Sequence, residues 1–255
     1  MPAARFAYLD HPRPIAFAHR GGTEAHPENT MAAFAHAVSL GYRYVETDVQ
    51  VTRDGVLLAF HDPTLERMTD RAGAVEALPW AEVRQARIAG SESIPRLEEL
   101  LTAWPDLRVN IDPKCDAAVV PLADVIEKTS ALDRICVASF SEARVREARR
   151  RLGPRLCTAL GPVGVFRLRL ASVGLPVGRF DQGAVQVPVR HHGLPIVDRP
   201  FIRAAHRNDV QVHVWTVNAA AEMDRLLDLG VDGLMSDETT LLKSVMQRRG
   251  LWTGG

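Results

Sequence analysis

The stretch that decides the fold reads Tyr44-Val45-Glu46-Thr47-Asp48, an apolar start that runs into two carboxylates. Short apolar runs of similar length recur along the chain, and longer segments with helical spacing separate them. This alternation is typical of parallel βα units, and the continuous hydrophobicity suits strands covered on both faces. The eight predicted strands are 15–19, 44–48, 107–112, 135–139, 155–160, 184–187, 211–216 and 232–236.

Helices are predicted between these strands. Ser141 suits a helix start, and Gly153 and Gly230 stand where helices end. Eight strands with helices in 255 residues favour an α/β fold of the TIM (β/α)8 barrel type, a single domain over 1–255. A doubly wound open sheet is the alternative, but its GxGxxG turn is absent. The predicted helices are 28–40, 96–103, 116–130, 141–152, 199–208, 219–229 and 237–249.

Two segments depart from this rhythm. Asp54-Gly55 predicts a hairpin after the second strand, with a return strand that ends at His61. Residues 63–95 are too long for a simple barrel loop, so we expect a small insertion there, over the top face. Residues 161–180 mix glycine and proline with large apolar residues. This second segment is either a mobile apolar lid or an irregular fifth helix.

Composition narrows the class of protein. The chain has 31 basic and 31 acidic residues, so its net charge of zero argues against a duplex-binding protein and no nucleic acid is expected. The three cysteines, Cys115, Cys136 and Cys157, show no metal-ligand spacing and suit a reducing, cytoplasmic location. The residues before Asp10 form no apolar run and no stretch approaches 18 uninterrupted apolar residues, so we expect neither secretion nor a membrane span. Peripheral membrane contact stays open, and we expect a monomer or homodimer.

Carboxylates gather at predicted strand ends, where parallel barrels place their working groups. Glu46 and Asp48 are two residues apart on one strand and therefore share a face, and Asp112 ends the next strand. Oxygen donors without a Cys/His cluster suit one hard divalent cation, Mg²⁺ or Ca²⁺. The alternative is that nearby arginines such as Arg43 or Arg53 neutralise the two acids.

Histidines and cations stand at the same strand ends. His19 and His61 could divide the roles of general base and general acid, although a lone histidine is more often structural. Arg20 and Lys114 are cations of the kind that hold phosphate, and salt bridges to the acids are compatible with that role. Trp215, taken alone, would be assigned to the barrel core.

In combination these motifs resemble the glycerophosphodiester phosphodiesterase family. The matching blocks span the chain from about Ala16 to Asp237. They are His19-Arg20-Gly21, Pro27-Glu28-Asn29-Thr30, Glu46-Thr47-Asp48-Val49, Thr52-Arg53-Asp54-Gly55, His61-Asp62, Ile111-Asp112-Pro113-Lys114, Ser139-Phe140, Gln186, Val214-Trp215-Thr216-Val217-Asn218 and residues 230–237.

The resemblance implies a TIM barrel with an insertion after the second strand. It implies a phosphoric diester hydrolase that cleaves a glycerophosphodiester into glycerol 3-phosphate and an alcohol. The implied site holds a divalent cation on the carboxylates and uses the two histidines as general base and acid, while Arg20 and Lys114 contact phosphate and Trp215 lines the pocket. The metal ligands implied are Glu46, Asp48 and Asp112, and the catalytic residues are His19 and His61.

One residue departs from the family pattern, and three alternative functions remain. Asp112 stands where the family usually has glutamate, and Pro113 follows it, so the third ligand could reach the ion through water. The rivals are a phospholipase D-like enzyme acting on lysophospholipids, a non-catalytic barrel that binds a phosphorylated ligand, and a sugar-phosphate isomerase. Both histidines beside the acids argue against the last two.

Overall fold

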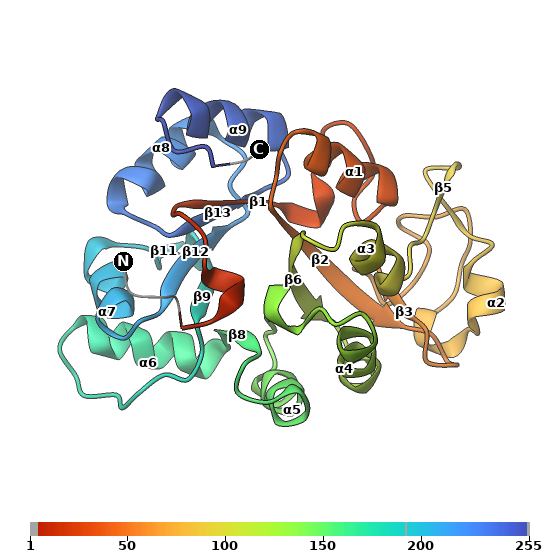
Figure 1. Ribbon diagram of the computed structural model, residues 1–255, viewed down its shortest axis with the longest axis horizontal. Helices are drawn as coiled ribbons and strands as arrows, with labels where there is room; N and C mark the ends of the chain where they lie inside the picture. The colour runs from red at the N-terminus through yellow and green to blue at the C-terminus, as the bar shows by residue number, and fades with distance from the viewer. Residues whose placement is uncertain (1–4, 192, 254–255) are drawn as a thin grey trace.

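The central sheet closes into a barrel. A computed structural model describes residues 5–191 and 193–253 (Figure 1). Eight strands pair in parallel, and β1 pairs with both β13 and β2, which closes the sheet and excludes the open alternative. The barrel strands are β1 (Ile15–Ala18), β2 (Tyr44–Val51), β6 (Arg108–Pro113), β7 (Ile135–Val137), β8 (Cys157–Leu160), β9 (Ala184–Pro188), β12 (Gln211–Trp215) and β13 (Gly233–Ser236).

Helices form the outer layer of the barrel (Figure 1). Thr30 accepts a hydrogen bond from the backbone of Ala33 and so starts the first helix at Met31, three residues later than predicted. Ser141 caps α5 in the same way, and Gly230 ends α8 with a φ of 89°. The helices are α1 (Met31–Ser39), α3 (Leu97–Ala103), α4 (Val119–Lys128), α5 (Glu142–Leu152), α6 (Pro162–Ser172), α7 (Arg199–Arg207), α8 (Ala220–Leu229) and α9 (Thr239–Arg248).

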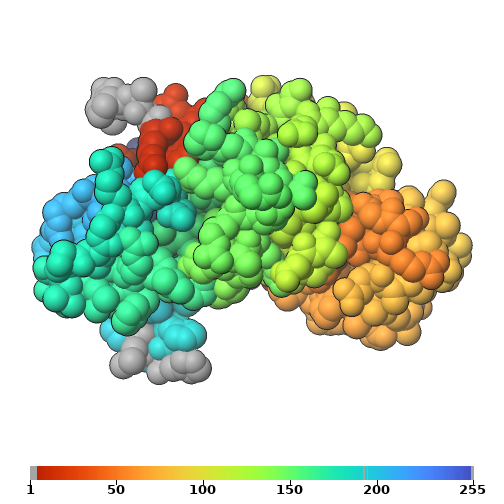
Figure 2. Space-filling view, turned by 90° about the horizontal axis from the view of Figure 1, so that it is seen from below, coloured from red at the N-terminus to blue at the C-terminus, as the bar shows by residue number. Residues whose placement is uncertain are grey.

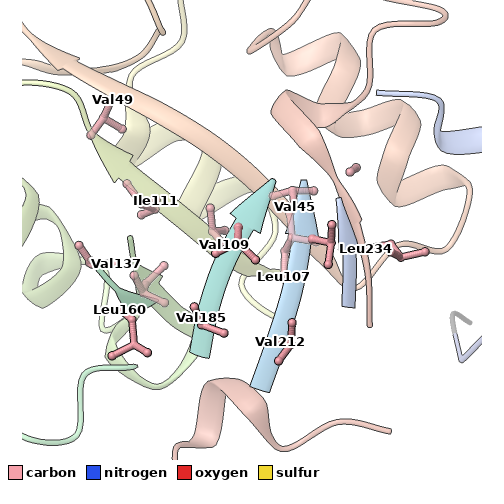
Figure 3. Packing of buried hydrophobic residues seen from close by; sticks show 14 of the residues in the cluster. Val45, Val49, Leu107, Val109, Ile111, Val137, Leu160, Val185, Val212 and Leu234 are labelled. Carbon is pink, nitrogen blue, oxygen red and sulfur yellow. The ribbon is translucent and has the colours of Figure 1, made fainter. Parts of the chain in front are cut away.

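Two apolar layers hold the barrel together. Between the sheet and the helices lies a cluster to which Val45, Val109 and Leu234 belong (Figure 3). A second cluster lies inside the barrel, where Phe17 and Tyr44 pack with the 3₁₀ helix η1 (Ala7–Leu9). Ile15 and Tyr44 begin their strands, so the amino-terminal segment closes the end of the barrel opposite the strand carboxyl ends.

The predicted hairpin and insertion are present. β3 (Leu57–Ala59) runs antiparallel to β2 and ends two residues before the predicted His61. Between β3 and α3 the chain forms the excursion expected over 63–95, with a small apolar cluster of its own beside α1 and α3 (Figure 1). Its elements are η3 (Val75–Ala77), α2 (Trp80–Val83), β4 (Arg87–Ile88) and β5 (Glu92–Ser93).

The segment 161–180 contains a helix. α6 covers Pro162–Ser172, so the helical interpretation is correct for these residues, and residues 173–180 connect it to β9. A short hairpin of β10 (Arg190–His191) and β11 (Leu194–Pro195) follows β9. The remaining short helices are η2 (His19–Gly21), η4 (Asp116–Ala118) and η5 (Leu132–Arg134). Within residues 5–191 and 193–253, no helix has the length and apolar character needed to cross a membrane.

Candidate active site

A cleft of about 1040 Å³ opens at the carboxyl ends of the barrel strands. This is the end where (β/α)8 barrels carry their active sites. The side chains predicted from the sequence come from five strands or the loops that follow them, and the structure brings all of them to this one cleft. They are His19, Arg20, Glu46, Asp48, His61, Asp112, Lys114 and Trp215.

A tight turn after β1 positions the first two of these residues. Arg20 has a φ of 53°, and Gly21 and Gly22 have φ values of 85° and 88°. A Cβ on Gly22 would come within 2.6 Å of the Thr239 Cγ2 atom, so a side chain is excluded by both conformation and space. The conformation of this turn therefore requires Gly21 and Gly22.

Two carboxylates flank the His19 ring. The Nδ1 atom lies 2.6 Å from Asp237 Oδ1, and Nε2 lies 3.6 Å from Glu46 Oε2. Burial disfavours the charged ring, but the negative charges of Glu46 and Asp237 outweigh burial and raise the pKa of His19 above its usual 6.5. Asp237 thus fixes the ring orientation while Nε2 remains on the Glu46 side.

His61 is held in a similar way from the other side of the cleft. Its Nδ1 atom lies 2.6 Å from Asp62 Oδ1. Arg67, from the insertion, donates to both oxygens of Asp62, and these hydrogen bonds lower the pKa of Asp62 to about 2. Gln50 also donates to the backbone carbonyl of His61 over 3.0 Å. The ring and its partner are therefore tied to both the barrel and the insertion.

Two cations neutralise the buried acids. Lys114 Nζ lies 2.7 Å from Asp48 Oδ1 and 2.7 Å from Asp112 Oδ2, and Arg20 Nε lies 2.8 Å from Asp48 Oδ2. The neutralisation considered from the sequence thus occurs for Asp48, where Arg20 and Lys114 provide it in place of Arg43 or Arg53, but Glu46 has only His19 as an ion-pair partner among the residues that the structure describes. These two cations also face the cleft, as a phosphate-binding role requires.

The pKa values of the three acidic side chains are shifted in different directions. Burial and the neighbouring Asp48 charge raise the pKa of Glu46 to about 7. Burial also acts on Asp48, but the charges of Lys114 and Arg20 outweigh it and lower that pKa. The pKa of Asp112 is raised by burial, which outweighs the attraction of Lys114. Glu46 and Asp112 therefore hold protons more readily than ordinary carboxyls.

A divalent cation fits the chemistry of this site in two respects. The donors are carboxylate oxygens, and the buried Asp48 Oδ2, although 2.8 Å from Arg20 Nε, accepts no hydrogen bond from any described residue. A cation would also relieve the unfavourable charge that raises the pKa of Glu46. In the part of the chain that the structure describes, no three His, Cys, Asp or Glu side chains are grouped as metal ligands. The metal site stays a prediction.

Three positioning residues escaped the sequence analysis as individuals, although each lies in a quoted motif or in the insertion. Asp237 and Asp62 hold the histidines, and Glu28 accepts hydrogen bonds from Arg20 over 3.1 Å and from Arg67 over 2.7 Å. Asp62 could have been found because it directly follows His61. The Glu28 contacts depend on the path of the insertion, which no local pattern reveals.

The other half of the cleft is apolar. Trp215 is half-buried, contacts the inner core cluster and lines the cleft, so it serves both of the roles considered for it. Phe140 packs edge-on against it with ring centroids 5.9 Å apart. Further apolar lining comes from β8, α6, α7 and the loop before it: Leu160, Pro162, Val165, Phe166, Ile196 and Phe201.

The fold and the site together define a (β/α)8-barrel enzyme whose cleft combines two carboxylate-held histidines with two cations. The model of the glycerophosphoryl diester phosphodiesterase family matches residues 19–159 and 179–241, and the chain belongs to this family. It is accordingly a phosphoric diester hydrolase with glycerophosphodiester phosphodiesterase activity. The resemblance seen in the sequence is confirmed.

Individual relatives agree with this assignment. The chain is 42% identical over 254 residues to the "probable glycerophosphodiester phosphodiesterase 2" of Mycobacterium tuberculosis, covering 97% of this chain and 96% of that one. It is 28% identical to a glycerophosphodiester phosphodiesterase of Caldanaerobacter subterraneus, covering 92% and 99%. The solved structure of an Oleispira antarctica phosphodiesterase, in complex with the product sn-glycerol-3-phosphate, shares the fold with a TM-score of 0.79 at 23% identity, covering 92% and 97%.

Proposed function

We propose that the protein hydrolyses glycerophosphodiesters by two-histidine acid/base catalysis in the cleft described above. The observation that carries this proposal is that His19 and His61 line one cleft, and each has its Nδ1 atom held by a carboxylate. Carboxylate-bound imidazoles have a fixed orientation, so each ring presents Nε2 for proton transfer. Arg20 and Lys114 lie beside them to bind the phosphate.

The proposed reaction begins with the glycerol 2-hydroxyl of the substrate. One histidine takes the proton of the 2-hydroxyl while the hydroxyl oxygen forms a bond to phosphorus. The other histidine gives a proton to the oxygen of the leaving alcohol while the bond between that oxygen and phosphorus breaks. Water then opens the cyclic phosphate to glycerol 3-phosphate, with the histidine roles reversed. Arg20 and Lys114 stabilise the charge on the phosphate oxygens throughout.

We further propose that Glu46, Asp48 and Asp112 hold one divalent cation, Mg²⁺ or Ca²⁺. When bound, this ion would supply positive charge against the phosphate and make a nearby hydroxyl more acidic. Asp112 is one methylene shorter than glutamate and is engaged by Lys114, which is consistent with an indirect, water-mediated contact. Asp48 Oδ2 is buried and forms an ion pair with Arg20 but accepts no hydrogen bond within residues 5–191 and 193–253, which supports a direct contact.

The test is the release of glycerol 3-phosphate from glycerophosphocholine, detected by a coupled enzyme. We expect activity that EDTA removes and that Mg²⁺ or Ca²⁺ restores, and an inactive His61→Asn variant. Activity that survives EDTA would refute the metal proposal. A folded protein without activity with either ion would refute the proposed substrate.

A second candidate function is the hydrolysis of lysophospholipids, favoured by the apolar half of the cleft. A glycerophosphodiester with one acyl chain would place its phosphate on the polar half and its chain against Phe140, Phe166 and Trp215. Choline release from lysophosphatidylcholine measures this activity. Phe140→Ala is expected to lower it about tenfold, because burial of one aromatic ring is worth roughly 1.5–3 kcal/mol. An equal loss on glycerophosphocholine would contradict this assignment.

A further inference from the structure

Exposed apolar side chains are concentrated on one wall of the barrel. Among the residues that the structure describes, six large hydrophobic side chains are exposed, and only Val120 on α4 lies elsewhere. The other five belong to the loop after β7, to α6 and to the loop that follows α6. They are Phe140 at 69% exposure, Val163 at 60%, Phe166 at 63%, Val173 at 71% and Leu175 at 51%, and we refer to these five residues as the α6 face.

The pattern on α6 is that of a helix with two apolar sides. Gly164 and Leu168 are buried against the barrel, as the inner side of a surface helix should be. Val163, Phe166 and Val173 are three and seven residues apart and therefore share the outer side, where a solvated helix would carry polar residues. These outer side chains do not belong to the hydrophobic core, and exposed apolar side chains gathered on one side indicate a contact with another surface.

The same part of the chain is rich in arginine. Residues 141–180 contain nine arginines and two glutamates, a formal charge of +7 within the segment. Ion pairs of Arg144, Arg155 and Arg169 with aspartates outside the segment neutralise three of these charges and leave an excess of +4. Arg146, Arg150 and Arg179 are exposed. Figure 2 shows this side of the molecule, with α5 in green and α6 in the colours that follow toward teal. Apolar side chains among arginines are typical of helices that lie on anionic lipid surfaces.

Helix α6 lies outside the residues that the family model matches, and the α6 face is continuous with the cleft. The family model matches residues on both sides of α6 but leaves out 160–178. Phe140 and Phe166 belong to the α6 face and also line the cleft. A surface seated on the α6 face would therefore meet the apolar half of the cleft directly.

We infer that the α6 face docks the enzyme on an anionic lipid surface and presents the cleft to substrates held there. The inference rests on the proposed function, because the docked lipid surface would be the source of the substrates that occupy the apolar half of the cleft. A second copy of this chain is a poorer occupant, because a twofold contact would place two surfaces with an excess of positive charge against each other. A nucleic acid would use the arginines but leave the apolar side chains without a partner.

The experiment is co-sedimentation with vesicles of phosphatidylcholine, with and without phosphatidylglycerol, at low and high salt. The test variant is Val163→Ser/Val173→Ser/Leu175→Ser, which changes only side chains outside the cleft. Val120→Ser is the matched control, because Val120 is exposed on another helix. We expect binding to the anionic vesicles, weakened by salt, and at least a tenfold loss in the triple variant alone.

Several outcomes would overturn the inference. These are the absence of binding to anionic vesicles, equal binding by the triple variant, or tighter binding to duplex DNA than to vesicles in the same buffer. Far-UV circular dichroism verifies that each variant folds, and Leu175→Gln, in the loop after α6, provides a milder second variant with an expected partial loss. Turnover of soluble glycerophosphocholine tests the proposed function separately, and the triple variant should match the parent in that assay.

Discussion

One of the two histidine–aspartate pairs at the cleft closely resembles a pair at the opposite end of the barrel. At the cleft, His19 Nδ1 lies 2.6 Å from Asp237. At the opposite end, His206 Nε2 lies 2.7 Å from Asp232. In each pair the pKa of the histidine is raised and the pKa of the aspartate is lowered. Charge and titration alone therefore do not separate a catalytic pair from a structural one.

Their surroundings separate them. His19 is 16% exposed, lines the cleft and has its second ring nitrogen near Glu46. His206 is 40% exposed and lies at the end of α7, away from the cleft. Its partner Asp232 is buried, and it also accepts from the Arg13 side chain and the Val212 backbone. The first pair faces the cleft and can contact a ligand. The second pair connects three segments at the end of the barrel opposite the cleft, which we call the barrel floor.

The largest expected effect is on turnover at the cleft. His19→Asn should lower kcat/KM on glycerophosphocholine about 10³-fold, because it removes one of the two proposed proton-transfer groups. His206→Asn should change kcat/KM less than twofold. The coupled glycerol 3-phosphate assay measures both, with circular dichroism to verify folding. Similar losses in the two variants would contradict the assignment of His19 to the active site and of His206 to a structural role.

The polar half of the site was predictable because each residue ends a strand or follows one closely. Glu46, Asp48 and Asp112 are marked by their position in apolar runs, and His19 and Arg20 follow the first run directly. Parallel strands in a barrel bring such ends together wherever they stand in the sequence. A fold assignment was therefore enough to predict that they share a cleft.

The partners of these residues were less predictable. His19 and Asp237 are separated by 218 residues, and their contact depends on β1 pairing with β13. Lys114 bridging Asp48 and Asp112 depends on side-chain conformation. The 161–180 segment resisted assignment because a helix that is apolar on both sides shows no period. Such features are set by tertiary contacts or by a partner outside the chain.

Asp237→Asn tests the residue that positions His19, as Asp232→Asn does for the residue beside His206. The substitution keeps the shape but removes the charge that orients and stabilises a protonated His19. We expect kcat to fall by about ten- to a hundredfold with little change in KM, since the phosphate ligands stay in place. Steady-state kinetics measures the two separately. A loss expressed only in KM would show that Asp237 acts on substrate binding.

Asp232→Asn is the counterpart at the barrel floor. Here the lost charge leaves His206 and Arg13 with a weaker, neutral partner in a buried position. We expect a loss of about 1–3 kcal/mol in the free energy of unfolding, measured by denaturant titration, with kcat unchanged. If Asp232→Asn instead lowered turnover at full stability, the floor pair would have to communicate with the cleft.

The smallest effect concerns the pH dependence of that floor pair. The pKa of His206 is raised, first by its hydrogen bond to Asp232, so the folded state binds the proton more tightly than the unfolded chain does. Its stabilisation is therefore complete below the unfolded pKa near 6.5 and disappears as pH rises through the folded pKa. Because His206 is 40% exposed, solvent screens the pair and we expect about 0.5 kcal/mol.

His206→Gln tests this directly. The difference in free energy of unfolding between parent and variant should be largest at pH 5–6, where Asp232 with its lowered pKa is still charged, and should shrink toward pH 8. His11→Gln is a matched control, since burial lowers the pKa of His11 and its contribution has the opposite sign. A His206→Gln difference that grew with pH would show that the neutral ring is the stabilising form, and the floor pair would then be a hydrogen bond without an ion pair.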